Sequence, residues 1–263
     1  MVDFENKPSY GVYDLKVLMS LLRGPGGCPW DAEQTHGSIR RNLLEEAYEA
    51  AEAIDEDDTE HLLEELGDVL MQVVFHADIA EKAGRFSLDD IADATCKKLI
   101  RRHPHVFGEV KAKNGSESLV FWEEIKREEK LQDKVSDAMR SVANSLPALW
   151  RAEKIQKKAA KAGFDWPDYK GALEALCAEL HELEGAIQSG QGIEEELGDL
   201  LFSAVNVARF FDADPELVLG LSSDKFISRF AQVENAASDA GLALADMSLD
   251  EMEDLYQKAK LKE

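Results

Sequence analysis

The sequence has 263 residues and a formal net charge of -23, with 53 acidic side chains against 30 basic ones. This length allows one large domain or two of medium size. The acid excess argues against a general binder of nucleic-acid polymers or of anionic membranes, because phosphate-rich surfaces are recognised through basic patches. It does not exclude a small polyanion that arrives with its own divalent cation.

The cysteines and the apolar segments indicate which compartment to expect. Cys28, Cys96 and Cys177 are widely spaced and form no CxxC pair, so neither a zinc ribbon nor a disulfide framework is indicated. We expect reduced structural thiols. No apolar stretch approaches the roughly 18 residues of a membrane span, and the N-terminal residues lack the pattern of a signal peptide. We therefore expect a cytoplasmic protein with no membrane partner.

The first half of the chain carries apolar residues at helical spacing almost throughout. The pattern predicts helices over residues 13–23, 38–54, 60–82, 87–103 and 117–130. Residues 24–31 are expected to form a loop, because Pro and Gly end helices. Ser87 begins its helix with a capping box, and Pro104 ends it.

The second half repeats this plan. It predicts helices over residues 148–162, 171–187, 194–211, from 215 onward, and 250–262. Periodicity fades over 131–145, so we place a domain boundary there and expect domains of 1–132 and 133–263. No segment shows the alternation of a β-strand. The sequence therefore predicts an all-α chain with an internal duplication.

Constant sequence offsets support the duplication. EELGD at 64–68 returns within EEELGDL at 194–200. Glu65 and Glu196 are 131 residues apart, as are Asp68 and Asp199. The two copies drift slightly elsewhere, as differences in loop length between repeats would produce.

Each copy carries two pairs of carboxylates at i,i+3 spacing, which places each pair on one face of a helix. The pairs are Glu46 with Glu49, Glu65 with Asp68, Glu179 with Glu182, and Glu196 with Asp199. The short turn at 55–59 would bring two such helices face to face. Four converging carboxylates repel one another unless a cation balances them. Mg²⁺ fits, because it prefers oxygen ligands and keeps water and substrate phosphate in its shell.

A solvated acidic helix face is the alternative, since roughly one residue in five is acidic. Three features favour the metal site. Glu65 and Asp68 stand among apolar residues, Gly67 and Gly198 stand mid-helix at a cost of about 1 kcal/mol each, and both features occur twice. The glycines suggest close approach of another backbone or a ligand. A di-iron bundle would require Glu-x-x-His on its helices, and that spacing occurs only at 33–36, beside a loop.

Basic and aromatic residues supply candidate contacts to a phosphate-bearing ligand. The helices after the carboxylate pairs carry two i,i+4 basic pairs: Lys98 with Arg102, and Lys225 with Arg229. These pairs could clamp phosphate oxygens, or interact with helix ends and surface acids. Trp30 and Trp166 could stack on a base or fill a gap between helices. The chain has no Walker A or Rossmann pattern, so phosphate would be bound through metal and basic side chains.

At this point the motifs resemble those of the two-domain MazG nucleoside triphosphate pyrophosphohydrolases of bacteria, over almost the whole length. The segments that carry the resemblance are GCPWD at 27–31, LEEAYE at 44–49, EELGD at 64–68, RRHPHVF at 101–107, SLPAL at 145–149, KIQKKAAKAGFDW at 154–166, EEELGDL at 194–200 and KFISRF at 225–230. The family hallmark, EExxE followed by ExxD, is intact as Glu45, Glu46, Glu49, Glu65 and Asp68.

The resemblance implies an all-α NTP pyrophosphatase fold related to dimeric dUTPases, and a homodimer whose helices complete each bundle. It implies hydrolysis of NTPs, ATP among them, to NMP and diphosphate with Mg²⁺, for which Mn²⁺ could substitute. Broad (d)NTP specificity and clearance of the nucleotide pool are expected.

In such two-domain proteins the C-terminal copy is usually taken as the active one. Its metal ligands here would be Glu179, Glu182, Glu196 and Asp199. Either of the first two would also orient and deprotonate the attacking water. Lys225 and Arg229 would meet phosphates, and Tyr256 would lie near the nucleotide.

The sequence departs from the family pattern at Ala178, which replaces the first Glu of the second EExxE. If that position orients water or supports the metal ligands, the C-terminal site is weakened and the N-terminal site matters more. If only the other four residues bind metal, nothing is lost. A non-catalytic nucleotide sensor or partner-binding scaffold is therefore the alternative. A purely structural helical repeat would not account for acids among apolar residues recurring beside a mid-helix glycine.

Overall fold

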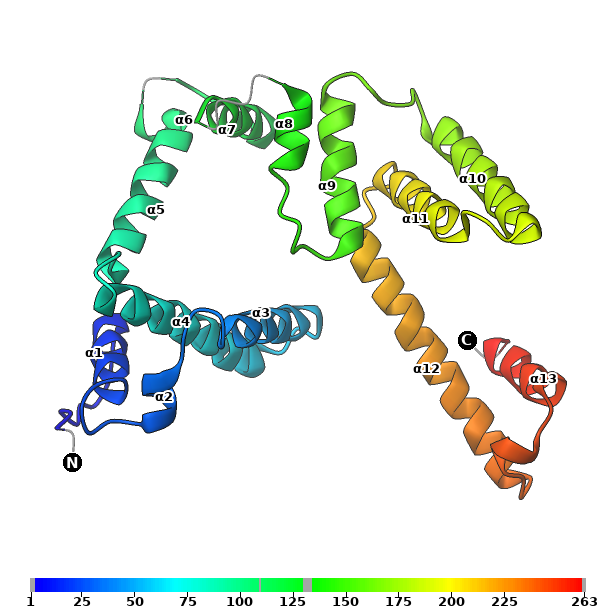
Figure 1. Ribbon diagram of the computed structural model, residues 1–263, viewed down its shortest axis with the longest axis horizontal. Helices are drawn as coiled ribbons and strands as arrows, with labels where there is room; N and C mark the ends of the chain where they lie inside the picture. Colours follow the sequence, from blue (N-terminus) through cyan, green and yellow to red (C-terminus); the bar gives the residue numbers. More distant parts are fainter. Residues whose placement is uncertain (1–2, 109, 130–133, 262–263) are drawn as a thin grey trace. The chain divides into compact units, whose positions relative to one another are not determined.

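The chain is built from α-helices in the computed structural model, which describes residues 3–108, 110–129 and 134–261 (Figure 1). These described segments contain no β-strand, which confirms the predicted all-α class. The chain divides into two compact units, Met1–Lys126 and Arg127–Glu263, here named the N-terminal and C-terminal units. The expected boundary between 132 and 133 lies outside the described residues.

The N-terminal unit contains every long helix expected there, with ends close to the predicted ones. Its helices are α1 (Val12–Leu22), α2 (Pro29–Glu33), α3 (Arg40–Asp55), α4 (Thr59–Lys82), α5 (Leu88–Arg102), α6 (Pro104–Phe107) and most of α7 (Gly115–Glu129), whose last three residues belong to the C-terminal unit. The predicted last residue of the final helix, 130, lies outside the described residues. The longest helix of this unit, α4, packs against both α3 and α1.

The C-terminal unit also has the expected long helices. They are α8 (Val135–Arg140), α9 (Ala148–Lys161), α10 (Tyr169–Ser189), α11 (Ile193–Arg209), α12 (Pro215–Asp239), a 3-10 turn η1 (Leu244–Asp246) and α13 (Leu249–Lys260). The α10/α11 pair corresponds to the α3/α4 pair of the first unit. The predicted final residue of the last helix, 262, lies outside the described residues.

Three short helices occupy segments where the sequence predicted no helix. The loop expected over residues 24–31 gives way to α2 at Pro29, and α6 begins at Pro104. Proline suits the first turn of a helix, because its missing N–H would have had no partner there. Helix α8 lies in the stretch where periodicity fades. The loop and connection expectations were therefore wrong at these positions.

Side-chain caps define the ends of the helix pairs. The Asp58 carboxylate accepts hydrogen bonds of 3.0 Å from the backbone N–H groups of Glu60 and His61, which begins α4. The predicted capping box at Ser87 is present. Gly190, in the left-handed region at φ 69°, ends α10. Because these caps fix where each helix begins and ends, they also fix which residues face each other across a pair.

The core of the N-terminal unit lies where α1, α4, the start of α5 and the residue that precedes α3 meet. Its buried members are Met19, Ile39, Val74, Phe75, Ala77 and Leu88. A buried ion pair joins the end of α1 to α4 beside this core. Arg23 Nε donates to Asp78 Oδ2 at 2.7 Å, and the two side chains are 6% and 7% exposed. The Arg23 guanidinium lies over the Phe75 ring and donates to the backbone carbonyl of Asp31, so it joins α1, α2 and α4.

The C-terminal unit has an ion pair in a comparable place, but with the charges exchanged. There the basic residue stands on the carboxylate helix: Arg209, at the end of α11, pairs with Asp165 in the loop before α10. Arg209 stands 131 residues after Asp78. The hydrogen bonds from Arg209 hold the pKa of Asp165 below its usual value. Each pair ties the segment before the acidic helix to the carboxylate helix.

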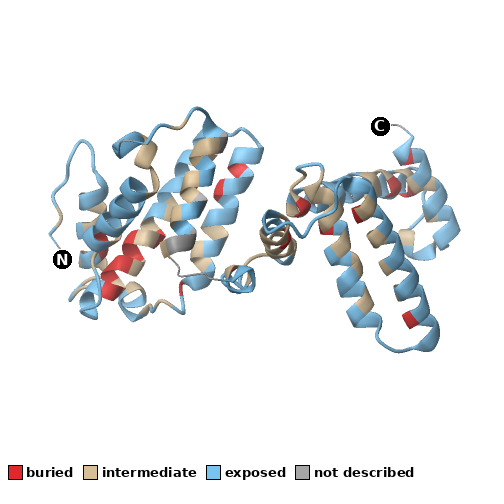
Figure 2. Ribbon diagram, turned by 90° about the horizontal axis from the view of Figure 1, so that it is seen from above, coloured by how far each residue is buried: buried red, intermediate tan, exposed pale blue. Residues whose placement is uncertain are grey.

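Both helix pairs expose large apolar side chains. Figure 2 shows exposed residues over much of the helical surface of each unit. Leu63 is 76% exposed on α4, and Leu201 is 51% exposed on α11. Leu66 and Leu197 are exposed beside them. Contiguous exposed apolar residues typify surfaces that bind a partner.

Candidate metal centre

The α3/α4 pair brings three of its four candidate carboxylates together. Glu46 and Glu49 from α3 and Glu65 from α4 each place one oxygen within 4.8 Å of the others. We name these three residues the N-terminal cluster. Glu65 is only 7% exposed. The fourth candidate, Asp68, stands one turn further along α4 and acts electrostatically on Glu46.

Glu65 has one paired oxygen and one unpaired oxygen. Its Oε1 lies 3.2 Å from His61 Nε2, one turn earlier on α4. Its Oε2 is buried and has no hydrogen-bond partner among the described residues. A buried polar atom without a partner costs about 1–3 kcal/mol, and more when the group is charged. A bound cation would supply the missing interaction.

The pKa of Glu46 is raised by its surroundings in the N-terminal cluster. Burial raises this pKa most, and the negative charges of Asp68, Glu49 and Glu65 raise it further. A hydrogen bond from Gln72 acts in the opposite direction. This pattern is expected of carboxylates packed together without a counter-ion.

The α10/α11 pair builds a second group, here named the C-terminal cluster. Glu179 of α10 and Glu196 and Asp199 of α11 place one oxygen each within 4.8 Å of the others. Burial and the charges of Glu182 and Asp199 raise the pKa of Glu196. Glu182 therefore faces the group as well. Asp199 and Glu182 are exposed, so this cluster is more open than the N-terminal one.

Both clusters fit a hard divalent cation. They offer carboxylate oxygens from two facing helices, which is the ligand type that Mg²⁺ prefers. Glu45 does not belong to the N-terminal cluster, because it pairs with Arg41 at 2.6 Å. The replacement of the equivalent glutamate by Ala178 therefore removes no member of the C-terminal cluster.

The glycines beside the clusters do not mark a close approach within the chain. A Cβ atom added at Gly67 or Gly198 would meet nothing within 4 Å. The expected contact with another backbone is thus wrong for a single chain. Gly171 is different, because a Cβ there would lie 2.7 Å from the ring of Trp166. That contact places Trp166 against the first turn of α10.

The basic pairs lie on helices that lead away from the clusters. Helix α5 leaves α4 at the end opposite the α3/α4 turn (Figure 1), and α12 packs mainly against α13. Arg102 lies with its guanidinium carbon 5.0 Å from the Trp122 ring, and Arg229 lies 6.0 Å from the Tyr256 ring. Lys98 and Lys225 are exposed on the same helices. A single chain therefore assembles the carboxylates but does not bring the predicted phosphate-binding residues to them.

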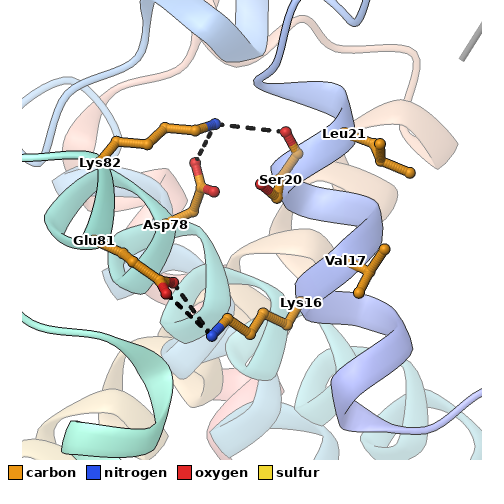
Figure 3. Close-up of a pocket in the computed structure, with 7 residues that line it drawn as sticks. All are labelled: Lys16, Val17, Ser20, Leu21, Asp78, Glu81 and Lys82. Atoms are coloured by element: carbon orange, nitrogen blue, oxygen red, sulfur yellow. Dashed lines mark hydrogen bonds and ion pairs between the residues drawn. The ribbon is translucent and has the colours of Figure 1, made fainter.

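A shallow pocket between α1 and α4 lies toward the C-terminal end of α4, away from Glu65 (Figure 3). Its two lysines each contact a carboxylate: Lys16 pairs with Glu81 at 3.3 Å, and Lys82 pairs at 2.9 Å with Asp78, which also pairs with Arg23. None of the cluster carboxylates lines this pocket, so it is not the candidate site.

Sequence reasoning missed two residues that contact the N-terminal cluster, His61 and Gln72. The signal for His61 was present, because it stands four residues before Glu65 and so on the same helix face. Gln72 gave no comparable signal, since its partner Glu46 is on the other helix.

Fold and site together define an all-α tandem-repeat protein with a carboxylate cluster on each of two helix pairs. The sequence model described as the MazG nucleotide pyrophosphohydrolase domain matches residues 34–107 and 168–233. Each matched segment contains one complete cluster. The chain belongs to the MazG family, as its motifs predicted.

Relatives match across nearly the whole chain. The nucleoside triphosphate pyrophosphohydrolase/pyrophosphatase MazG of Thermotoga maritima is 44% identical over 94% of each chain. The nucleoside triphosphate pyrophosphohydrolase of Escherichia coli K12 is 43% identical over 95% of this chain and 97% of its own. Protein YabN of Bacillus subtilis is 47% identical over 93% of this chain, which spans 50% of YabN.

None of the helices in the described part of the chain has the length and apolar character that crossing a bilayer requires.

Proposed function

We propose that this protein hydrolyses nucleoside triphosphates to nucleoside monophosphates and diphosphate, with Mg²⁺ as cofactor and Mn²⁺ as a substitute. The observation that carries the proposal is the buried, unpartnered oxygen of Glu65 within a group of facing carboxylates. Family membership and the names of the relatives support the same reaction. We further propose broad (d)NTP specificity, including ATP, and a role in clearing the cytoplasmic nucleotide pool.

In the proposed C-terminal site, Glu179, Glu182, Glu196 and Asp199 hold the cation. When bound, Mg²⁺ neutralises phosphate charge and lowers the pKa of coordinated water. Glu179 or Glu182 orients the attacking water and accepts its proton. The water oxygen forms a bond to the α-phosphorus as the bond to the bridging oxygen breaks, and diphosphate leaves. In the N-terminal copy, Glu46, Glu49, Glu65 and Asp68 are the corresponding ligands.

The residues that would contact the nucleotide complete the proposal. We assign phosphate contacts to Lys98, Arg102, Lys225 and Arg229, and nucleotide contacts to Trp166 and Tyr256. Because the basic helices lead away from the clusters of their own chain, we propose that a homodimer brings them together. The exposed leucines on α4 and α11, and the open space beside Gly67 and Gly198, support a second chain packing there.

The reaction can be tested by product analysis. The protein is incubated with each normal and damaged NTP, with and without Mg²⁺, and the products are separated by anion-exchange chromatography. We expect NMP and diphosphate, formed only with a divalent cation. NDP and orthophosphate as main products would reject the proposed bond cleavage.

Two variants assign the reaction to a copy. Glu196→Gln removes a ligand from the C-terminal cluster and Glu65→Gln removes its N-terminal equivalent. We expect at least one of them to lower kcat by about 100-fold or more, as removal of groups that stabilise transition-state charge does. Glu52→Gln is the control, because Glu52 is exposed on α3 outside both the cluster and the EExxE motif, and it should retain activity.

A catalytically weakened sensor or scaffold is not favoured. Ala178 is the reason to consider this alternative, because it replaces the first glutamate of the second EExxE. The pairing of the equivalent Glu45 with Arg41, outside the cluster, supports the enzyme instead. Loss of hydrolysis in Glu196→Gln and Glu65→Gln would separate an enzyme from a scaffold.

A further inference from the structure

The two carboxylate helices begin differently. Helix α4 begins at Thr59, whereas α11 begins at Ile193, which the 131-residue offset aligns with Leu62. The first turn of α4 therefore has no helical counterpart. Gly192, which takes the place of His61, is in the left-handed region at φ 75°.

That additional turn places an imidazole against the N-terminal cluster. His61 Nε2 lies 3.2 Å from Glu65 Oε1, and the Glu65 side chain is 10% exposed. With one oxygen held by His61, the other, Oε2, is left buried and unpartnered within the group. The contact thus fixes which oxygen is free for a cation.

A second supporting contact comes from within α4. Gln72 is 5% exposed, and hydrogen bonding from it lowers the pKa of Glu46 on α3, whereas its own Oε1 is buried and has no partner among the described residues. At the same offset the C-terminal copy has Ser203, whose shorter side chain cannot extend as far. Two of the three carboxylates of the N-terminal cluster, Glu65 and Glu46, thus have a supporting residue. At the same offset the C-terminal copy has a glycine and a serine in the places of His61 and Gln72.

Contacts from neighbouring side chains can orient metal ligands before the metal arrives. Their loss typically lowers metal affinity by about 10–100-fold. Fixing the ligand side chains in advance also reduces the conformational entropy that binding must overcome.

We infer that His61 and Gln72 are positioning residues, and that the N-terminal cluster consequently binds divalent cations more tightly than the C-terminal cluster. This inference rests on the proposed function, because it concerns the cation that the reaction requires. It assigns the two copies unequal roles: one holds its cation tightly, and the other exchanges it readily.

The first experiment measures Mn²⁺ binding to the full chain, by electron paramagnetic resonance of the free ion. We expect two classes of site that differ in affinity by about 10-fold or more. Glu65→Gln should remove the tight class, and Glu196→Gln should leave it. Equal affinities, or loss of the tight class in Glu196→Gln, would overturn the inference.

The second experiment tests the positioning residues themselves. His61→Leu should weaken the tight class by about 10-fold, whereas His61→Gln, which keeps an N–H donor, should stay within about 3-fold of the original affinity. Gln72→Ser should weaken the tight class, and Ser203→Gln should strengthen the weak one. Circular dichroism checks that each variant is folded. Unchanged Mn²⁺ affinity in a folded His61→Leu would overturn the assignment.

Failure of the inference can be told apart from failure of the proposed function. NMP and diphosphate formed by a protein whose two sites bind Mn²⁺ equally would overturn the inference alone. A protein that binds no Mn²⁺ and releases no diphosphate would overturn both.

Discussion

Glu46 lies close to other carboxylates that are proposed to bind the cation, and this arrangement lowers the stability of the folded protein when no cation is bound. Burial and three neighbouring acids raise its pKa above the ordinary value of 4.5. Raising the folded-state pKa of a carboxyl means that the ionised form is less stable in the folded protein than in the unfolded chain. The penalty is absent at low pH, where Glu46 is protonated in both states, and it is fully present once the pH exceeds the folded-state pKa.

Glu46→Gln should therefore raise the melting temperature of the cation-free protein at neutral pH, and the gain should shrink as the pH falls toward 4.5. The measurement is calorimetry in chelator across this pH range. Saturating Mg²⁺ should reverse the order, because a cation stabilises only the protein that binds it. Glu45→Gln, outside the cluster, should show neither effect, and a gain that grows toward low pH would contradict the assignment.

The charged partners of α4 supply a second residue-scale prediction. Arg23→Ala leaves the buried carboxylate of Asp78 with Lys82 as its remaining partner. Removing one member of a buried ion pair costs about 3–5 kcal/mol, so we expect a loss of unfolding free energy near the lower end of this range. Urea denaturation measures it.

Arg41→Ala is the matched control, because Arg41 and Glu45 form an exposed pair whose removal should cost at most about 1 kcal/mol. Equal losses from Arg23→Ala and Arg41→Ala would mean that the buried pair contributes no more than a surface one.

At the scale of elements, the long helices followed directly from the sequence, because each has at least 11 residues and so carries about three or more turns of apolar periodicity. The carboxylate pairs followed too, since i,i+3 spacing fixes a helix face and a short turn fixes the partner helix. The helices that were missed, α2, α6 and α8, have 5, 4 and 6 residues. So few residues cannot display a helical period, and two of them begin at a proline that was taken as a helix end.

The supporting contacts of the site lay beyond the reach of sequence reasoning for a different reason. Gln72 and Glu46 are 26 residues apart and meet only because α3 and α4 pack in one particular register. The basic pairs on α5 and α12 show the converse. Their spacing is regular, but the helices that carry them run away from the clusters of the same chain, which local patterns do not reveal.

In the single chain, large apolar side chains of α4 and α11 are exposed to solvent. We propose that a homodimer buries them. Leu66→Glu on α4 and Leu201→Glu on α11 would each place a charge in such an interface. We expect these variants to be monomeric at concentrations where the original protein is dimeric, as measured by light scattering after size-exclusion chromatography. Lys258→Glu on α13 is the control and should remain dimeric. A monomeric original protein would contradict the proposed dimer.

The exchanged ion pairs of the two units bear on how a tandem duplication folds reliably. Neighbouring repeats that resemble each other can exchange segments during folding, which is a common route to misassembly in repeated domains. If α11 took the place of α4, Arg209 would stand where Asp78 stands and would confront Arg23; in the reverse exchange Asp78 would meet Asp165. Either exchange would place like charges beside each other, which is unfavourable, so the reversed polarity would disfavour pairing a helix with the partner of its counterpart.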